Sequence, residues 1–228
     1  MLYRGNKVAC PVCERSFSKF LSYGSNVAHR ENVLCPYDLT LERHRLMWLY
    51  LKKESNFFTA ENLKVLHIAP EQCFLPLFKK QSNLTYLTGD LESPIADLHF
   101  DLHAIPLEDN RFDVVFCNHV MEHVKDPIQC MKEIYRVMNK GGWAIMQVPQ
   151  DFNREETYED ASITSPEDRE KHFWQKDHVR LFGKDYPQWL EKAGFKVTEF
   201  NLNNHFSKEE VEHYRLMKGE VLYIAHKG

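Results

Sequence analysis

The sequence predicts an α/β fold with a mostly parallel sheet. From residue 63 onward, short apolar runs typical of buried strands alternate with segments whose apolar residues recur at helical spacing. Strands that alternate with helices pair in parallel, because each helix carries the chain back to the same edge of the sheet. The first 38 residues differ, since they are loop-rich and contain three closely spaced cysteines. We therefore expect a small N-terminal module ahead of the α/β domain.

Seven segments are expected to form the strands of the sheet. Each is a short apolar run, and the run at 111–119 has the continuous Val-Val-Phe centre of a strand that is covered on both faces. The seven segments are residues 63–70, 84–90, 96–100, 111–119, 143–149, 195–203 and 220–227. In sheets of this kind the ligand lies at the carboxyl ends of the strands.

The clearest helix in the sequence follows the fourth of these strands. Asp126 is a good N-cap, and Pro127 suits the first helical position. The buried face is expected to consist of Ile128, Met131, Ile134 and Met138, with the helix ending at Gly141-Gly142. Further helices are expected over residues 39–53, from about residue 165, over residues 185–193, and between the last two strands.

Composition places the chain among folded proteins. It has 228 residues, of which 43% are hydrophobic and 27% charged, enough for one α/β domain with a small appendage. No apolar run approaches the ~20 residues that cross a bilayer, and the first ten residues lack the long apolar stretch typical of a secretory signal. A cytoplasmic location without a membrane partner is expected. Residues 1–53 hold nine Lys and Arg against four Asp and Glu; the net charge is −4, so residues 54–228 carry −9.

The expected ends of the first two strands bear on the ligand. Asp90 ends the second strand, about 20 residues beyond the loop after the first, where an acid can accept hydrogen bonds from both hydroxyls of a ribose. A turn or helix-capping role is the alternative for Asp90. No glycine lies between Gly24 and Gly89, so the turn that brings backbone close to a pyrophosphate is missing. These features favour a ligand with a ribose but no phosphates, and they disfavour a nicotinamide dehydrogenase.

Three motifs between residues 65 and 149 carry a family resemblance. They are VLHIAPE, FDLHAIPLEDNRFDVVFCNHVMEHVKDP and EIYRVMNKGGWAIMQVP. Together they resemble the class I S-adenosylmethionine-dependent methyltransferases, in the branch that acts on diverse small molecules, and the likeness extends over residues 60–228. H-I-A-P-E stands where E-x-G-x-G is usual. The resemblance implies a Rossmann-like, seven-stranded sheet and S-adenosylmethionine as cofactor, which has a ribose and an adenine but no pyrophosphate.

The resemblance also implies which residues bind the cofactor. Asp90, with Leu91 beside it, would bind the ribose hydroxyls. Asp101 would accept a hydrogen bond from the adenine amino group, and the Leu102 amide would reach a ring nitrogen. Asn118 and His119 would border the methionine portion and the methyl group. The remaining implied residues lie at the first strand: Ala69, Pro70 and Glu71 would line the turn, and His67 would donate a hydrogen bond.

Methyl transfer is a displacement at a sulfonium carbon, so positioning and desolvation supply most of the acceleration. A base helps only when the acceptor must lose a proton. The catalytic candidates are His178 and His119, with Arg180 available for an acidic acceptor group. A hydrogen-bonded structural role is the alternative for His178. Residues 150–180, which are polar and contain several aromatic side chains, are expected to form a lid over the acceptor.

The cysteines of the N-terminal module suggest a structural zinc site. Cys10-Pro-Val-Cys13 is a tight knuckle, and Cys35-Pro-Tyr-Asp38 follows it. Two such turns can face each other around tetrahedral zinc. Related methyltransferases have a fourth cysteine in this arrangement, where this chain has Asp38. The fourth ligand is Asp38 or else His44 or His29; alternatively, Asp38 caps the next helix and no metal binds.

These expectations divide the chain into three parts. They are a zinc-ribbon-like module at 1–38, a linking helix at 39–59 and a methyltransferase domain at 60–228. The expected function is methyl transfer from S-adenosylmethionine to a small or medium-sized acceptor. Two alternatives remain open: a non-catalytic binding module, or methylation of RNA or a ribosomal protein guided by the basic N-terminal part.

Overall fold

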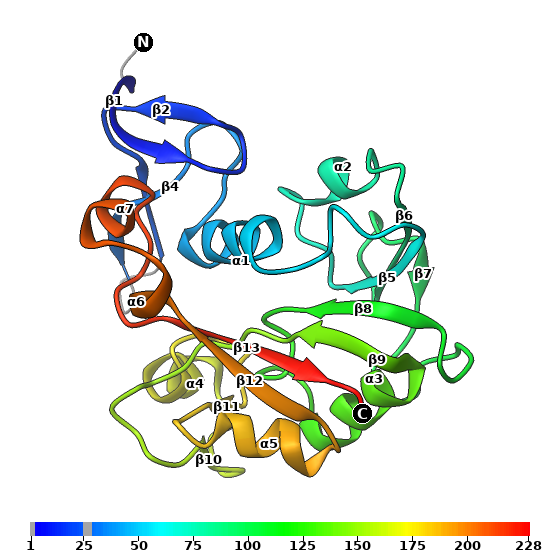
Figure 1. Cartoon of the computed structure of the whole chain (residues 1–228). Helices are drawn as coiled ribbons and strands as arrows, with labels where there is room; N and C mark the ends of the chain where they lie inside the picture. The colour runs from blue at the N-terminus through cyan, green and yellow to red at the C-terminus, as the bar shows by residue number, and fades with distance from the viewer. Residues whose placement is uncertain (1–2, 25–28) are drawn as a thin grey trace. The chain divides into compact units, whose positions relative to one another are not determined.

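A computed structural model describes residues 3–24 and 29–228 (Figure 1). The chain divides into two compact units, each built from two stretches of sequence. Unit 1 contains residues 1–60 and 199–222, and unit 2 contains residues 61–198 and 223–228. Within the described residues, none of the helices combines the length and the apolar character that crossing a membrane requires.

The described residues of unit 1 form two small antiparallel sheets and three helices, and they include the end of β12 and the start of β13. The pairs are β1 with β2 and β3 with β4, and helix α7 packs beside β1. The elements are β1 (Arg4–Cys10), β2 (Arg15–Phe17), β3 (Leu21–Tyr23), β4 (Arg30–Leu34), α1 (Glu42–Lys53), α6 (Leu202–His205) and α7 (Lys208–His213). Segments from both ends of the sequence therefore build this unit.

Helix α1 begins at Glu42 rather than at the expected residue 39. Leu39 has a φ of +59°, which is incompatible with a right-handed helix. Leu41 is the N-cap residue, and its backbone N–H donates to Nδ1 of His44 at 3.0 Å. The imidazole of His44 therefore satisfies one of the amides left over at the helix start.

A buried arginine holds unit 1 together. Arg45 has no exposed surface, and its guanidinium donates four hydrogen bonds of 2.7–2.9 Å to backbone carbonyls. Two of these carbonyls belong to Val33 and Thr40 in the N-terminal stretch, and two belong to Tyr214 and Arg215 near the C-terminus. The planar fork of donors suits this arrangement because one side chain reaches several carbonyls at once.

Unit 2 contains most of a seven-stranded sheet of the order β12-β13-β9-β8-β5-β6-β7. The pairs from β9 to β7 are parallel, and β13 runs antiparallel to β9. The strands are β5 (Leu63–Ile68), β6 (Leu84–Asp90), β7 (Leu98–His99), β8 (Phe112–Cys117), β9 (Met138–Ile145), β12 (Lys196–Asn201) and β13 (Val221–His226). The predicted Rossmann-like, mostly parallel sheet is confirmed.

The helices of unit 2 begin close to the residues at which the sequence predicted them to begin. Asp126 caps α3 by accepting from the Gln129 backbone N–H at 3.0 Å, and Ser165 caps α4 by accepting from that of Asp168. The elements are α2 (Leu75–Phe78), α3 (Pro127–Val137), α4 (Pro166–Phe173), α5 (Tyr186–Lys192) and the antiparallel pair β10 (Tyr158–Glu159) and β11 (Arg180–Leu181).

The predicted end of α3 at Gly141-Gly142 is wrong. The helix ends at Val137, and Met138 already has the extended ψ of 147° with which β9 begins. A side chain at Gly142 would lie 2.9 Å from the backbone oxygens of Asn139 and Asp113. This glycine is therefore needed for the close approach of backbone at the start of β9, rather than as a helix stop.

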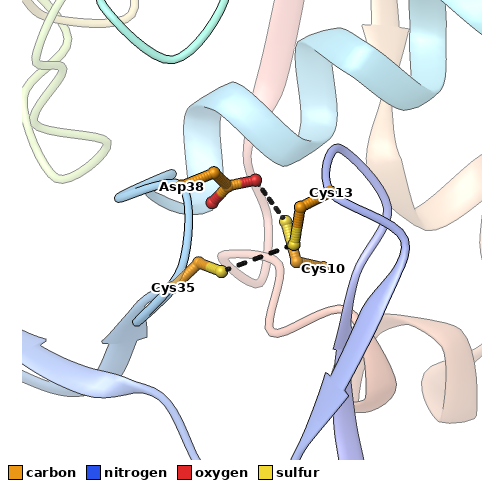
Figure 2. Close-up of side chains that lie close together, drawn as sticks. All are labelled: Cys10, Cys13, Cys35 and Asp38. Carbon is orange, nitrogen blue, oxygen red and sulfur yellow. Dashed lines mark hydrogen bonds between the residues drawn. The ribbon is translucent and has the colours of Figure 1, made fainter.

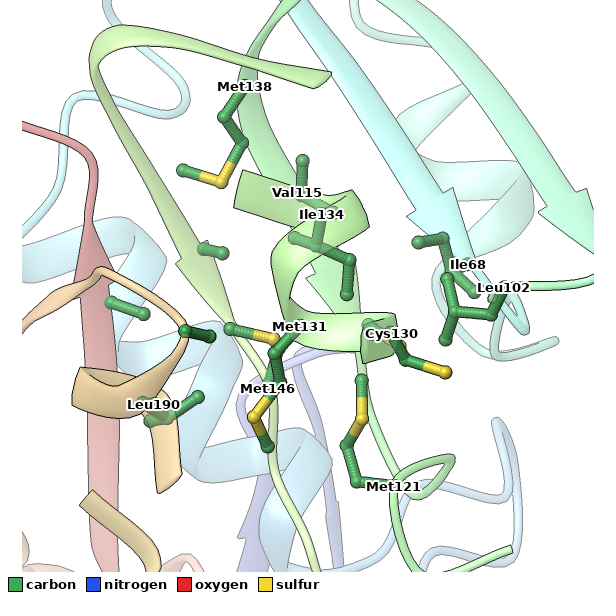
Figure 3. Packing of buried hydrophobic residues seen from close by; sticks show 14 of the residues in the cluster. Ile68, Leu102, Val115, Met121, Cys130, Met131, Ile134, Met138, Met146 and Leu190 are labelled. Carbon is green, nitrogen blue, oxygen red and sulfur yellow. The ribbon is translucent and has the colours of Figure 1, made fainter. Parts of the chain in front are cut away.

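The core of unit 2 lies between α3 and the sheet (Figure 3). Met131 and Ile134 of α3 are fully buried, together with Val115 of β8 and Leu190 of α5. Ile128, expected on the buried face, is only partly buried, and Met138 contributes to the core from β9. This core holds the parallel strands in place. The residues at the carboxyl ends of these strands are therefore held in fixed positions.

We predict that Arg45→Ala destabilises unit 1 by about 3 kcal/mol, because two buried and two partly buried carbonyls lose a charged donor. Hydrogen exchange of the β4 amides measures this loss as faster exchange. Lys7→Ala, which removes an exposed cation from β1, is the control and should change stability by less than about 0.5 kcal/mol. Equal exchange in Arg45→Ala and the unmodified protein would contradict the role given to Arg45.

Candidate functional site

The carboxyl ends of β5 and β8 share an uncommon backbone conformation. Ala69, one residue beyond β5, has a φ of +49°, and His119, two residues beyond β8, has a φ of +56°. Both strands end earlier than expected because these residues leave the extended conformation. A non-glycine residue in this region costs about 1–2 kcal/mol and is frequent at functional sites. Ala69 thus adopts the turn that a glycine would adopt without strain.

The side chain of His67 stabilises this turn. Its ring is fully buried; Nδ1 lies 2.7 Å from the hydroxyl of Tyr86, and Nε2 is hydrogen-bonded to the carboxylate of Glu71. Both ring nitrogens are therefore engaged within the protein. His67 holds Glu71 in position, which differs from the direct contact with a ligand that the sequence suggested.

A chain of hydrogen bonds joins three strand ends. The Asn118 side chain donates from Nδ2 to Oε1 of Glu71 at 3.0 Å, and its Oδ1 accepts from the backbone N–H of Gln147 at 3.0 Å. The N–H of His119 donates to the carbonyl of Gln147 at 2.7 Å. Glu71, Asn118 and His119 are thereby brought together. Gln147 was not predicted, although its place just after β9 was the available signal.

Two further acids lie at the ends of β6 and β7. Asp90 directs one oxygen, Oδ1, to the backbone N–H groups of Glu92 and Ser93 at 2.9 and 2.8 Å. Asp101 accepts from the backbone and the ring of His103, and these hydrogen bonds lower the pKa of Asp101. The flanking residues differ, because the side chain of Leu91 is exposed and that of Leu102 belongs to the core.

Three histidines surround one buried carboxylate on the segment after β8. Glu122 is 1% exposed, and its Oε1 lies 3.4 Å from Nδ1 of His119, 3.9 Å from Nε2 of His123 and 4.0 Å from Nε2 of His178. Burial lowers the pKa of His178. The two catalytic candidates, His119 and His178, thus meet at the same carboxylate. Glu122 and His123 belong to the pattern H-V-M-E-H after β8, and the sequence favoured a packed or capping role for His123 over a catalytic one.

Arg180 is engaged within the protein. Its guanidinium donates to the backbone carbonyls of Met121, Val124 and Lys125 at 2.6–3.2 Å and pairs with Glu159. It therefore anchors the segment that carries Glu122 and His123. This finding differs from the expectation that Arg180 faces an acidic acceptor.

The two cysteine knuckles of unit 1 have the same backbone turn. In the first, the N–H of Glu14 donates to the carbonyl of Cys10 at 2.9 Å, and Glu14 has a φ of +58°. In the second, the N–H of Leu39 donates to the carbonyl of Cys35 at 3.1 Å, and Leu39 has a φ of +59°. This equivalence gives Asp38 the place in the second turn that Cys13 has in the first.

The four side chains point toward one another (Figure 2). Sγ of Cys10 lies 3.1 Å from Oδ2 of Asp38, and Sγ of Cys13 lies 3.8 Å from Sγ of Cys35. All four potential ligand atoms lie within 4.8 Å of one another. Hydrogen bonding from the Cys35 thiol lowers the pKa of Cys10 to about 7. Three thiols and a carboxylate at this spacing suit tetrahedral zinc.

The other expected ligands are occupied elsewhere. His44 accepts at the start of α1, and His29 is paired with Glu31 at 2.7 Å. Asp38 accepts from the backbone and hydroxyl of Thr40 through Oδ1, while Leu41 rather than Asp38 is the N-cap of α1. The geometry therefore favours Asp38 as the fourth ligand.

Comparison with protein families gives a match in the central part of the chain. Residues 56–146 match the family model described as a methyltransferase domain. Solved structures with the same fold include an S-adenosylmethionine-dependent methyltransferase from Archaeoglobus fulgidus, with a TM-score of 0.53 and 18% identity over 80% of this chain and 93% of that one. The [4+2]-cyclase SpnF has a TM-score of 0.56 and 13% identity, and 80% of each chain is covered.

Two curated relatives are named tRNA U34 carboxymethyltransferase. The protein from Wolinella succinogenes is 35% identical over 88 residues, which cover 39% of this chain and 30% of the relative. The protein from Nautilia profundicola is 25% identical over 196 residues, which cover 79% of this chain and 62% of the relative. The chain thus spans less than two thirds of the length of either relative.

We predict that Co²⁺ bound to reduced protein shows thiolate-to-cobalt charge-transfer absorption, because three cysteines face one site in unit 1. Cys35→Ser should remove most of this absorption, since it removes one of the thiolates that Co²⁺ would contact. Cys73→Ser, which changes a cysteine of unit 2, is the matched control and should leave the absorption intact. A cobalt spectrum of the unmodified protein without charge transfer would refute the metal site.

Proposed function

We propose that this chain, whose residues 56–146 are a class I S-adenosylmethionine-dependent methyltransferase domain, transfers the methyl group to a small acceptor with an ionisable hydroxyl or amine. The family match and the Rossmann-like sheet confirm the domain recognised from the motifs. The observation that carries the proposal is the convergence of Glu71, Asp90, Asn118 and His119 at the carboxyl ends of adjacent parallel strands.

Each cofactor contact follows from the chemistry of the residue. The carboxylate of Asp90 suits the ribose hydroxyls, since Oδ1 is oriented by two amides and Oδ2 has no hydrogen-bond partner among the described residues. Asp101 suits the adenine amino group. Glu71, held by His67 and Asn118, suits the ammonium group of the methionine portion.

His119 is the best placed proton acceptor. Its side chain is 27% exposed, whereas that of His178 is 1% exposed and directed at Glu122. In the transfer, the acceptor oxygen or nitrogen forms a bond to the methyl carbon and the carbon–sulfur bond breaks. The electron pair of that bond stays on sulfur, giving S-adenosylhomocysteine. The acceptor proton passes to His119, whose ring the Glu122 carboxylate orients.

A small acceptor agrees with the charge of the larger part of the chain. Residues 54–228 carry a net charge of −9, which opposes the approach of a polyanion to the domain. Methylation of tRNA is the second candidate. Two observations favour it: the names of the two relatives, and the excess of five positive charges in residues 1–53.

Asp90→Asn should weaken the binding of S-adenosylhomocysteine at least about tenfold, because a neutral amide accepts hydrogen bonds from ribose hydroxyls less strongly than a carboxylate. Titration calorimetry measures this affinity. Glu92→Gln removes an equal, exposed charge two residues away and serves as the control for general electrostatics. Equal weakening in both variants would argue against a direct contact of Asp90 with the ribose.

Methyl-labelled S-adenosylmethionine tests the proposed acceptor. We expect label in the small-molecule fraction of a cell extract and none in added tRNA, with His119→Ala lowering turnover about 10²–10⁴-fold while cofactor affinity is kept. Label in tRNA would replace the proposal with the second candidate. Binding of S-adenosylhomocysteine without transfer to either fraction would identify a non-catalytic binding module.

A further inference from the structure

We propose that Glu122, His123 and His178 bind a divalent transition-metal ion in unit 2, separate from the cysteine site of unit 1. One carboxylate oxygen and two imidazole nitrogens lie within 4.8 Å of one another. Two histidines and one carboxylate are a ligand set typical of catalytic zinc and non-haem iron sites. The proposal that a metal binds here is independent of the proposed function, whereas a catalytic role of that metal rests on the proposed function.

The environment of His178 prepares it as a ligand. Its Nδ1 lies 2.8 Å from the carbonyl of Phe173, and a carbonyl can only accept, so Nδ1 carries the proton. In the neutral ring, Nε2 then presents a lone pair. This nitrogen is buried, has no hydrogen-bond partner among the described residues and points toward Glu122. A buried nitrogen left in this state is costly unless something binds it.

His123 is arranged in the same way. Its Nδ1 lies 3.2 Å from Oδ2 of Asp177, and its Nε2 is the nitrogen on the side of Glu122, 3.9 Å from Oε1. Metal-binding histidines almost always direct their second ring nitrogen to a carboxylate, a backbone carbonyl or water. Asp177 and the Phe173 carbonyl are two such partners, one behind each ring.

The distances leave room for an ion among the three side chains. Nε2 of His123 and of His178 lie 3.9 and 4.0 Å from Oε1 of Glu122, which is too far for good hydrogen bonds. A metal about 2.1 Å from each donor of a tetrahedral site separates the donors by about 3.4 Å. The observed spacing therefore requires each donor to move inward by only about half an ångström.

The backbone holds the ligands on a fixed support. The N–H of Val179 donates to the carbonyl of Glu122 at 2.9 Å, which ties the segment of His178 to that of Glu122. Arg180 adds hydrogen bonds to the carbonyls of Met121 and Val124, both at 2.6 Å. A preformed site of this kind loses little conformational freedom when it binds a metal.

Three protein ligands leave a coordination position for the acceptor. An ion held there would lower the pKa of a bound acceptor hydroxyl and so favour attack of its oxygen on the methyl carbon. His119, whose Nδ1 lies 3.4 Å from Glu122, would accept the proton of that hydroxyl. The inference therefore narrows the acceptor class to compounds with a hydroxyl that can bind a metal.

Equilibrium dialysis of the full, reduced chain against Co²⁺ tests the site directly. We expect about two cobalt ions per unmodified chain and about one in His123→Ala, Glu122→Gln and His178→Gln. The thiolate charge-transfer absorption, which reports the cysteine site alone, should be the same in all of them. His172→Ala removes an exposed histidine of α4 and is the matched control, with about two ions expected.

Two results would overturn the inference. One is a single cobalt ion per unmodified chain accompanied by full charge-transfer absorption. The other is retention of the non-thiolate cobalt in both His123→Ala and Glu122→Gln. His123 is 33% exposed, so its replacement keeps the test valid even where His178→Gln disturbs folding.

The same samples separate this inference from the proposed function. If the chain binds S-adenosylhomocysteine and transfers labelled methyl but holds no second metal, the proposed metal site is wrong and the proposed function is unaffected. If the unmodified chain binds a second metal that the variants lose, but binds no S-adenosylhomocysteine, the proposed function is wrong and the proposed metal site is supported.

Discussion

The hydrogen bonds of Asn118 are the constraint on which the site depends. This one amide accepts from the Gln147 backbone at the end of β9 and donates to Glu71 at the end of β5. It can do so because β8, which carries it, lies between those two strands in the sheet. Any shift of β8 against its neighbours would break both bonds. The core under the sheet therefore sets the geometry of the cofactor end of the site.

Two groups of side chains lie at the carboxyl ends of the parallel strands. On one side lie Glu71 and Asp90, whose carboxylates would face the ammonium group and the ribose of the cofactor in the proposed function. On the other side, His119 and His123 of the segment after β8 lie around Glu122 together with His178, which precedes β11. His119 lies at the boundary, since its backbone joins the Asn118 network and its ring faces Glu122. The strained φ of +56° at His119 changes the direction of the chain between these two groups of residues.

Unit 1 is stabilised by polar contacts as well as by its buried apolar residues. Its strands are short, and the buried Arg45 joins stretches from both ends of the sequence by donating to their carbonyls. The paired knuckles place three thiols and Asp38 together on turns that already have matching hydrogen bonds. In small units a bound metal commonly adds folding free energy to that of the hydrophobic core.

The sequence by itself determined the sheet, the start of α3 at Asp126 and the acids at the strand ends, because strand periodicity, helix caps and turn residues act over a few residues. It misplaced the end of α3, since the need for glycine at position 142 arises from backbone packing against residue 113. Only the tertiary structure decided that His67 supports Glu71, that Arg180 anchors a loop, and that His123 and His178 meet at Glu122. These contacts join residues up to 59 positions apart, and pairing at such separations is set by how the elements pack.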